Sequence, residues 1–299
     1  MARTLYIRDV FGRLGNLLYR FGNVYAHALE HGCVFWDRSL VAAGHLPAFP
    51  ELRRRLLLRF PSGPCLPVAC PSAWHRLQAA WLTGYPPAGR ACQWRARRSG
   101  FDLSRLADRV DDPKRPWILE GFPFHDRKAV QRQAAAIRRI LRPRDAWLED
   151  CRRQIESWRA GGVTLVAIHY RQGDYRKFKQ GKYFFPRGYY AKCARRIAAK
   201  NEDKRIRFLL FSDHPTQQAR FLGRLDALRV PLPANEHRDW ILMSMCDAII
   251  APVHSTFSGW AAFFGQVPIY RLDGVNRPGR LETFRQRTGL NENDVSGLP

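Results

Sequence analysis

The second half of the chain alternates short apolar runs with longer amphipathic segments. The apolar runs have the length of buried strands and lie at 163–169, 206–211, 248–253 and 267–270. The segments between them have apolar residues at helical spacing and lie at about 187–200, 215–228, 237–246 and 256–264. Regular alternation of strands and helices predicts a parallel sheet with helices on both faces.

The first half shows a weaker form of the same alternation. Strands are expected at 4–8, 33–36 and 117–119, and helices at about 16–31, 126–141 and 144–159. The turn Gly12-Arg13-Leu14-Gly15 precedes the first helix, and Gly32 ends it. Residues 40–116 are rich in Pro, Gly, Trp and Arg, and their weak periodicity predicts an irregular, partly helical insertion.

These patterns predict the fold class α/β, with two doubly wound, Rossmann-type domains that face a cleft. The first domain is expected to cover residues 1–160 and the second residues 161–299, with the boundary near Gly161-Gly162. Ligands of such sheets bind beyond the carboxyl ends of the strands, so the residues that follow each strand are the candidates for chemistry.

The chain carries a formal net charge of +24, which by itself would suit a nucleic-acid partner. However, 42 of the 50 basic residues are arginine, the charge is spread along the whole chain, and the sequence has no zinc-finger, RNA-recognition or basic-zipper motif. We therefore expect no nucleic acid. An anionic sugar-lipid acceptor or an acidic membrane surface fits the charge at least as well. The N-terminal residues lack the apolar stretch of a signal peptide, so we expect a cytoplasmic protein that can contact the inner membrane face peripherally.

Three strand ends in the second half carry side chains that suit a phosphate ligand. They are His169, Arg171 and Asp174 after the first strand, Ser212-Asp213 after the second, and Ser255-Thr256-Phe257-Ser258 after the third. An arginine offers a planar fork of donors, and hydroxyls with free amides at the start of a helix bind phosphate oxygens. Together these residues predict a pocket for a nucleotide diphosphate.

Each of these features also has an ordinary structural interpretation. Ser255-Thr256 could cap the helix that follows, and Asp213 could cap a helix beginning near residue 215. Arg171 could form a plain salt bridge, and His169 could be a hydrogen-bonded core histidine. Their combination at neighbouring strand ends favours the pocket over the separate explanations.

Four segments of the chain carry motifs that occur, in the same order, in a known family. They are Gly12-Arg13-Leu14-Gly15-Asn16; Leu119-Glu120-Gly121-Phe122 through Pro143; His169-x-Arg171-x-Gly173-Asp174-Tyr175; and Phe211-Ser212-Asp213 with Asp239-Trp240 through Ser255-Thr256-Phe257-Ser258. In these segments the sequence resembles the bacterial α-1,2-fucosyltransferases and, more distantly, the wider superfamily of GDP-fucose-dependent fucosyltransferases. The resemblance covers most of the chain outside residues 40–115.

The resemblance implies a GT-B fold whose C-terminal half binds the donor and whose N-terminal half binds the acceptor. It implies inverting, metal-independent transfer of fucose from GDP-fucose to a sugar hydroxyl of a glycan or glycolipid, with no cofactor. The chain has no Asp-x-Asp motif, which fits transfer without a metal. In the family pattern Arg171 stabilises the leaving diphosphate, and Asn16 orients the diphosphate or the sugar. The donor-binding positions are Gly15, His169, Asp213, Asp239, Ser255, Thr256, Phe257 and Ser258, with Asp239 and Phe257 at the guanosine.

The sequence does not identify the general base. Asp174 has the right chemistry but could simply support its loop, and His27 and Glu30, expected on the polar side of the first helix, are further candidates. Two alternatives remain beside fucosyl transfer. One is a non-catalytic relative that binds a nucleotide sugar or a carbohydrate, and the other is an enzyme that transfers a different GDP-sugar.

Overall fold

The computed structural model describes residues 4–7, 9–37, 39–58, 92–96, 100–107, 117–213, 219–230, 235–273 and 279–284. The chain divides into two compact units, and the division falls between Arg144 and Asp145. Among the described residues, none of the helices combines the length and the apolar character needed to cross a bilayer.

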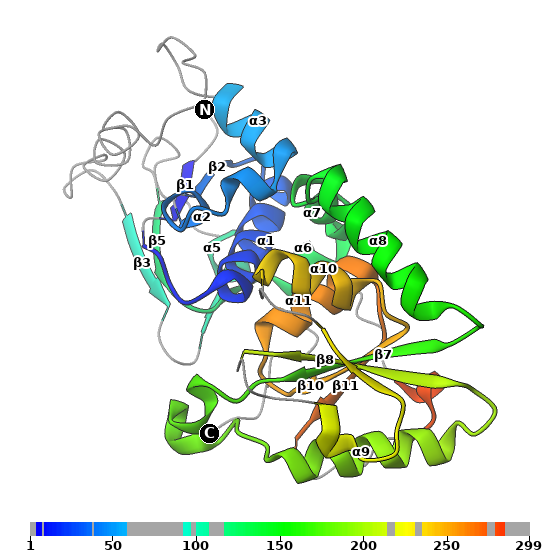
Figure 1. Ribbon diagram of the computed structural model, residues 1–299. Helices are drawn as coiled ribbons and strands as arrows, with labels where there is room; N and C mark the ends of the chain where they lie inside the picture. Colours follow the sequence, from blue (N-terminus) through cyan, green and yellow to red (C-terminus); the bar gives the residue numbers. More distant parts are fainter. Residues whose placement is uncertain are drawn as a thin grey trace. The chain divides into compact units, whose positions relative to one another are not determined.

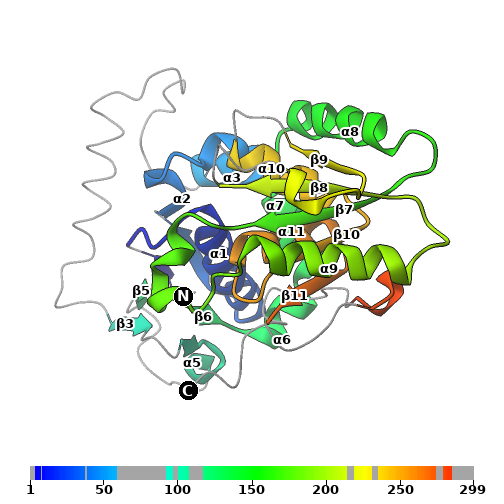
Figure 2. The same ribbon diagram turned by 60° about the horizontal axis from the view of Figure 1, so that its bottom comes forward.

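The second unit is built on one all-parallel sheet of five strands. In chain order they are β7 (Thr164–Tyr170), β8 (Ile206–Ser212), β9 (Ala227–Arg229), β10 (Ala248–Pro252) and β11 (Ile269–Leu272). The spatial order is β11-β10-β7-β8-β9, so the chain starts in the middle, builds outward through β8 and β9, and then returns to the other side of β7 (Figure 1 and Figure 2). The point where the direction reverses lies between β7 and β10, and ligands of doubly wound sheets bind beyond the strand ends at such a point.

Helices cover both faces of this sheet. They are α8 (Asp145–Arg159), α9 (Arg187–Lys200), α10 (Glu236–Ser244) and α11 (Thr256–Gly265). Alternate residues of a strand face opposite sides, and Val166, Ile168 and Ile250 face the same side as the buried face of α9. Figure 2 shows α9 lying across this face, and Figure 1 shows α10 and α11 on the opposite side. His169 therefore points to the side of α11.

The first unit has its own parallel sheet, with the spatial order β2-β1-β5-β3. Its strands are β1 (Thr4–Ile7), β2 (Val34–Asp37), β3 (Cys92–Ala96) and β5 (Trp117–Gly121), and β4 (Phe101–Asp102) pairs separately with β6 (Phe124–His125). Its helices are α1 (Leu14–Glu30), α2 (Ser39–Ala42), α3 (Pro50–Leu58), α5 (Ser104–Ala107), α6 (Arg127–Arg132) and α7 (Ala134–Ile140). The core lies between α1 and the sheet, where Val24 and Ala28 pack against Leu5 and Leu119.

The predicted α/β class with parallel, doubly wound sheets is confirmed. One predicted helix is wrong. Where residues 215–228 were expected to be helical, the described part forms a single 3-10 turn, Ala219–Leu222, and then β9. Gly223, with a φ of +70°, ends the turn, and the residues after it pair with the buried strand β8. The predicted helix 126–141 is also divided, because α6 ends at Arg132 and α7 begins at Ala134.

The two units meet earlier in the sequence than the expected boundary at residues 160 and 161. The helix at the junction, α8, belongs to the second unit because it packs against β7 and α10. The region expected to be an irregular insertion also holds β3, a strand of the main sheet of the first unit. Most of that region, including 59–91 and 108–116, lies outside the described residues.

Candidate active site

The polar residues predicted at the strand ends gather where β7 and β10 end. His169 is the penultimate residue of β7, and Ser255 follows β10 and caps the N-terminus of α11. The Nδ1 atom of His169 lies 3.1 Å from the Oγ atom of Ser255. One contact therefore joins the two strand ends on either side of the reversal point.

The protonation of His169 follows from its surroundings. Only 5% of its surface is exposed, and burial, followed by the positive charges of Arg171 and Arg271, lowers its pKa to about 3. The imidazole is therefore neutral at physiological pH. The backbone N–H of Ser258 already donates to the Ser255 hydroxyl oxygen at 3.3 Å. The Ser255 oxygen thus contacts both the first turn of α11 and the His169 ring.

Two carboxylates hold the guanidinium of Arg171. Its Nη2 atom lies 2.9 Å from an oxygen of Asp174, and its Nε atom lies 3.4 Å from an oxygen of Asp213. The guanidinium carbon also stands 5.5 Å from the centre of the Tyr175 ring, a cation–π distance. Only 15% of the Arg171 side chain is exposed. It is therefore a fixed cation at the carboxyl end of β7 and not a mobile surface arginine.

Asp213 organises the loop that carries Arg171. Its two carboxylate oxygens accept hydrogen bonds from the backbone N–H groups of Gln172, at 2.9 Å, and Gly173, at 3.0 Å. The approach is so close that a Cβ atom on Gly173 would stand 2.6 Å from the Asp213 oxygen. The Gln172 side chain, which is buried, donates to the carbonyl of Phe185. A side chain at position 173 would therefore have to displace the Asp213 carboxylate.

The segment 255–258 forms the capped start of α11. The Ser255 side chain is the N-cap, and Ser258 is fully buried beneath the first turn. Thr256 and Phe257 are half-buried, and the Phe257 ring lies 5.5 Å from the His169 ring. Ser255 therefore caps α11, as the structural interpretation of the sequence has it, and it also contacts His169.

Sequence reasoning missed Arg271, a half-buried residue of β11. Its Nη1 atom donates to the carbonyl oxygens of Pro252 and Ser255, each at 3.2 Å. It therefore places a second positive charge behind the turn between β10 and α11. The sequence signal was a charged residue directly after the predicted apolar run 267–270.

Asp239 lies in the first turn of α10 and not at a strand end. Burial raises its pKa to about 6, against the opposing effect of the neighbouring Arg238. Helix α10 packs on α11, where the rings of Trp240 and Trp260 meet at 6.1 Å. Asp239 is thus a half-buried carboxylate on a packed helix pair.

Gly15 and Asn16 belong to the first unit, as do the base candidates His27 and Glu30, whereas the other predicted site residues belong to the second. Asn16 lies in the first turn of α1, and its side chain folds back over Gly12. Gly12 has a φ of +75°, and a Cβ atom there would collide with the Asn16 amide. The glycine at position 12 therefore leaves room for the Asn16 side chain.

The candidates for the general base have very different environments. Asp174 pairs with Arg171, and its side chain is 44% exposed. The expectation that His27 and Glu30 lie on a polar helix face is wrong for His27, which is buried and contacts Asp126 at 2.8 Å. Glu30 accepts hydrogen bonds from the side chains of Arg132 and Gln133.

No family model and no curated protein matches the chain in sequence. Solved structures do match. FUT1 of Arabidopsis thaliana, in a complex with GDP, superposes with a TM-score of 0.56 at 11% identity, over 93% of this chain and 71% of that one. NodZ α-1,6-fucosyltransferase soaked with GDP-fucose gives 0.52 at 15% identity, over 96% of this chain and 100% of that one. Fucosyltransferase NodZ from Bradyrhizobium gives 0.53 at 15% identity, over 93% and 100%. The chain thus has the GT-B-like fold of these fucosyltransferases.

Proposed function

We propose that the protein is a glycosyltransferase that moves fucose from GDP-fucose to a sugar hydroxyl of a glycan or glycolipid. The observation that carries the proposal is the position of Arg171, a fixed and largely buried cation at the reversal point of the second sheet. Its contacts to Asp174 and Asp213 use Nη2 and Nε, which leaves the Nη1 group for a phosphate oxygen. The structural neighbours with bound GDP and GDP-fucose support the choice of donor.

In the proposed reaction, an acceptor hydroxyl attacks the anomeric carbon of fucose while the bond to the β-phosphate oxygen breaks. Positive charge develops on the sugar and negative charge on the leaving diphosphate. Arg171 and the backbone N–H groups at the start of α11 stabilise that negative charge, so that no metal ion is needed. Attack from the face opposite the leaving group inverts the anomeric configuration, and an α-1,2 linkage is the product that the sequence motifs favour.

The remaining predicted residues receive supporting roles in this proposal. His169 is neutral and holds the Ser255 hydroxyl, and Asp213 holds the loop that carries Arg171. Asp239 and Phe257 bind the guanosine. Gly15 binds the donor, and Asn16 orients the diphosphate or the sugar. Asp174 orients Arg171, and its carboxylate is the candidate general base.

The acceptor and the location of the enzyme form a further part of the proposal. A formal net charge of +24 suits an anionic glycolipid or lipopolysaccharide-type acceptor at the cytoplasmic face of a membrane. Co-sedimentation with anionic vesicles, lost as the salt concentration rises, tests this part independently of catalysis. Vesicles of neutral lipid are the control, and equal binding to both kinds would contradict it.

The test of the reaction is an assay of nucleotide release and product formation with GDP-fucose, GDP-mannose and UDP-galactose over a panel of glycan acceptors. Fucosyl transfer that persists in a chelator supports the proposal, and NMR of the product gives its anomeric configuration and linkage. Binding of GDP-fucose without turnover on any acceptor would favour a carbohydrate-binding relative. Turnover of GDP-mannose alone would identify a different GDP-sugar transferase.

A further inference from the structure

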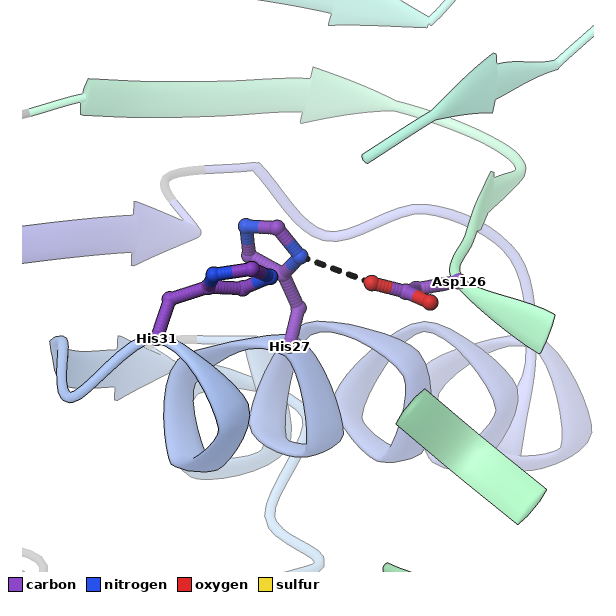
Figure 3. Close-up of side chains that lie close together, drawn as sticks. All are labelled: His27, His31 and Asp126. Carbon is purple, nitrogen blue, oxygen red and sulfur yellow. Dashed lines mark hydrogen bonds and ion pairs between the residues drawn. The ribbon is translucent and has the colours of Figure 1, made fainter. Parts of the chain in front are cut away.

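We propose that the first unit binds a zinc ion through His27, His31 and Asp126. His27 and His31 are one helical turn apart at the end of α1, so both imidazoles project from the same side of the helix. Asp126 precedes α6, and Figure 3 shows its carboxylate facing His27 while the His31 ring lies beside the His27 ring. Two histidines at i and i+4 on one helix are a recurrent zinc-binding pair.

The distances suit a shared ion. The His27 Nδ1 and Asp126 Oδ2 atoms lie 2.8 Å apart, and the centres of the two imidazole rings lie 4.3 Å apart. One ligand atom from each of the three residues lies within 4.8 Å of the other two. Two ligands of a tetrahedral zinc ion are separated by roughly 3.3 Å, so a small rotation of the exposed His31 side chain completes the set.

The Asp126 carboxylate is already oriented as a ligand. Its Oδ1 atom accepts the backbone N–H of Ala129 at 3.0 Å, which leaves Oδ2 directed at His27. Its backbone N–H donates to the side chain of Asn23 at 2.9 Å. Contacts of this kind, behind the ligand atoms, fix ligands in known zinc sites and strengthen binding.

A cationic side chain, Arg132, also lies near the cluster. The positive charge of Arg132 would weaken the binding of a cation, but its guanidinium is paired with Glu30 at 2.9 Å.

The ion would connect the last turn of α1 to the start of α6, two elements that are far apart in the sequence. His31 is exposed at the end of α1, which gives an ion access to the otherwise buried His27 and Asp126. Three protein ligands leave one position of a tetrahedral ion for water. Because the unfolded chain does not assemble this set, zinc should stabilise the first unit. This role is independent of the proposed fucosyl transfer.

The test compares the full-length protein with His31→Ala and Asp126→Asn in a zinc titration against a chromophoric chelator. Asp126→Asn keeps an oxygen for the Ala129 amide, and His31 is exposed, so both variants should fold. We expect one tight equivalent in the wild type, binding weakened by more than about tenfold in either variant, and a zinc-dependent rise in melting temperature in the wild type only. Co²⁺ should give the visible absorption of a tetrahedral site.

Glu149→Gln is the matched control. It removes one exposed carboxylate charge from α8, in the second unit, and leaves both the cluster and the pair between Arg132 and Glu30 intact, so zinc affinity should stay within about twofold of the wild type. Absence of saturable zinc binding in the wild type would overturn the proposal. So would equal affinity in the wild type and His31→Ala, which would leave the bond between His27 and Asp126 as a purely structural contact.

Discussion

The imidazole of His169 and the hydroxyl of Ser255 form a hydrogen bond of 3.1 Å between the end of β7 and the start of α11. The bond joins two neighbouring strand ends at the reversal point of the sheet, and both partners are buried. Because the imidazole is neutral, it positions the Ser255 hydroxyl without adding charge next to Arg171. The positive charge of the candidate site therefore comes from its arginines.

The neutral state of His169 should make stability depend on pH. Its pKa is about 3 in the folded protein and about 6.5 when exposed. Between these values the unfolded chain binds more protons, so stability should fall as the pH is lowered from about 6.5 towards 3, by on the order of 1 kcal/mol per pH unit. Urea unfolding of the wild type and His169→Asn at pH 7.5 and pH 5 checks this. The variant should lose less stability, and equal losses would contradict the account.

Asp239 should have the opposite dependence. Its pKa is raised from 3.8 to about 6, so above that range the folded protein holds a half-buried charge that water would solvate better. Asp239→Asn should therefore stabilise the protein at pH 8, on the order of 1–3 kcal/mol, and the gain should vanish near pH 4.

If Asp239 also binds guanosine, the same variant should lose affinity for GDP while it gains stability. Chemical unfolding and calorimetric titration with GDP on one preparation measure both quantities. A variant that is destabilised at pH 8 would refute the burial argument. A variant that binds GDP normally would refute only the guanosine role.

Gly173→Ala should disturb the loop that carries Arg171. The added Cβ would stand 2.6 Å from the Asp213 carboxylate, which must then give up a bond to a loop amide. We expect a loss of about 1–3 kcal/mol of stability and weaker GDP binding. Gly188→Ala is the matched control, because a Cβ on Gly188, in α9, meets nothing within 4 Å. It should leave GDP binding unchanged, and similar behaviour of the two variants would contradict the role of Asp213.

The sequence predicted most of the second unit because its signals are local. The predicted strand 163–169 corresponds to β7, and the residues after it form the loop that carries Arg171. The pairing of His169 with Ser255, 86 residues later, needed the strand order, which periodicity does not contain. Sequence reasoning missed β9. The helical pattern predicted there is interrupted at Gly223, and the residues after it form a strand because they pair with β8, a contact that local periodicity does not contain.

The first unit shows a different limit of sequence reasoning. The pair His27 and His31 was visible at helical spacing, but its partner Asp126 lies 99 residues beyond His27 and joins it only through the fold. The carboxylates that hold Arg171 illustrate the same point. Asp174 is close in sequence, whereas Asp213 reaches the loop from the end of β8.

The central claim is that Arg171 binds the diphosphate of a guanine nucleotide at the reversal point of the second sheet. Calorimetric titration of GDP into the wild type, Arg171→Ala and Arg195→Ala tests it most directly. Arg195 is an exposed arginine of α9, so its removal changes the net charge equally without touching the site. We predict that Arg171→Ala weakens GDP binding by about tenfold to a hundredfold while Arg195→Ala does not. Equal GDP affinity in the wild type and Arg171→Ala would contradict the account.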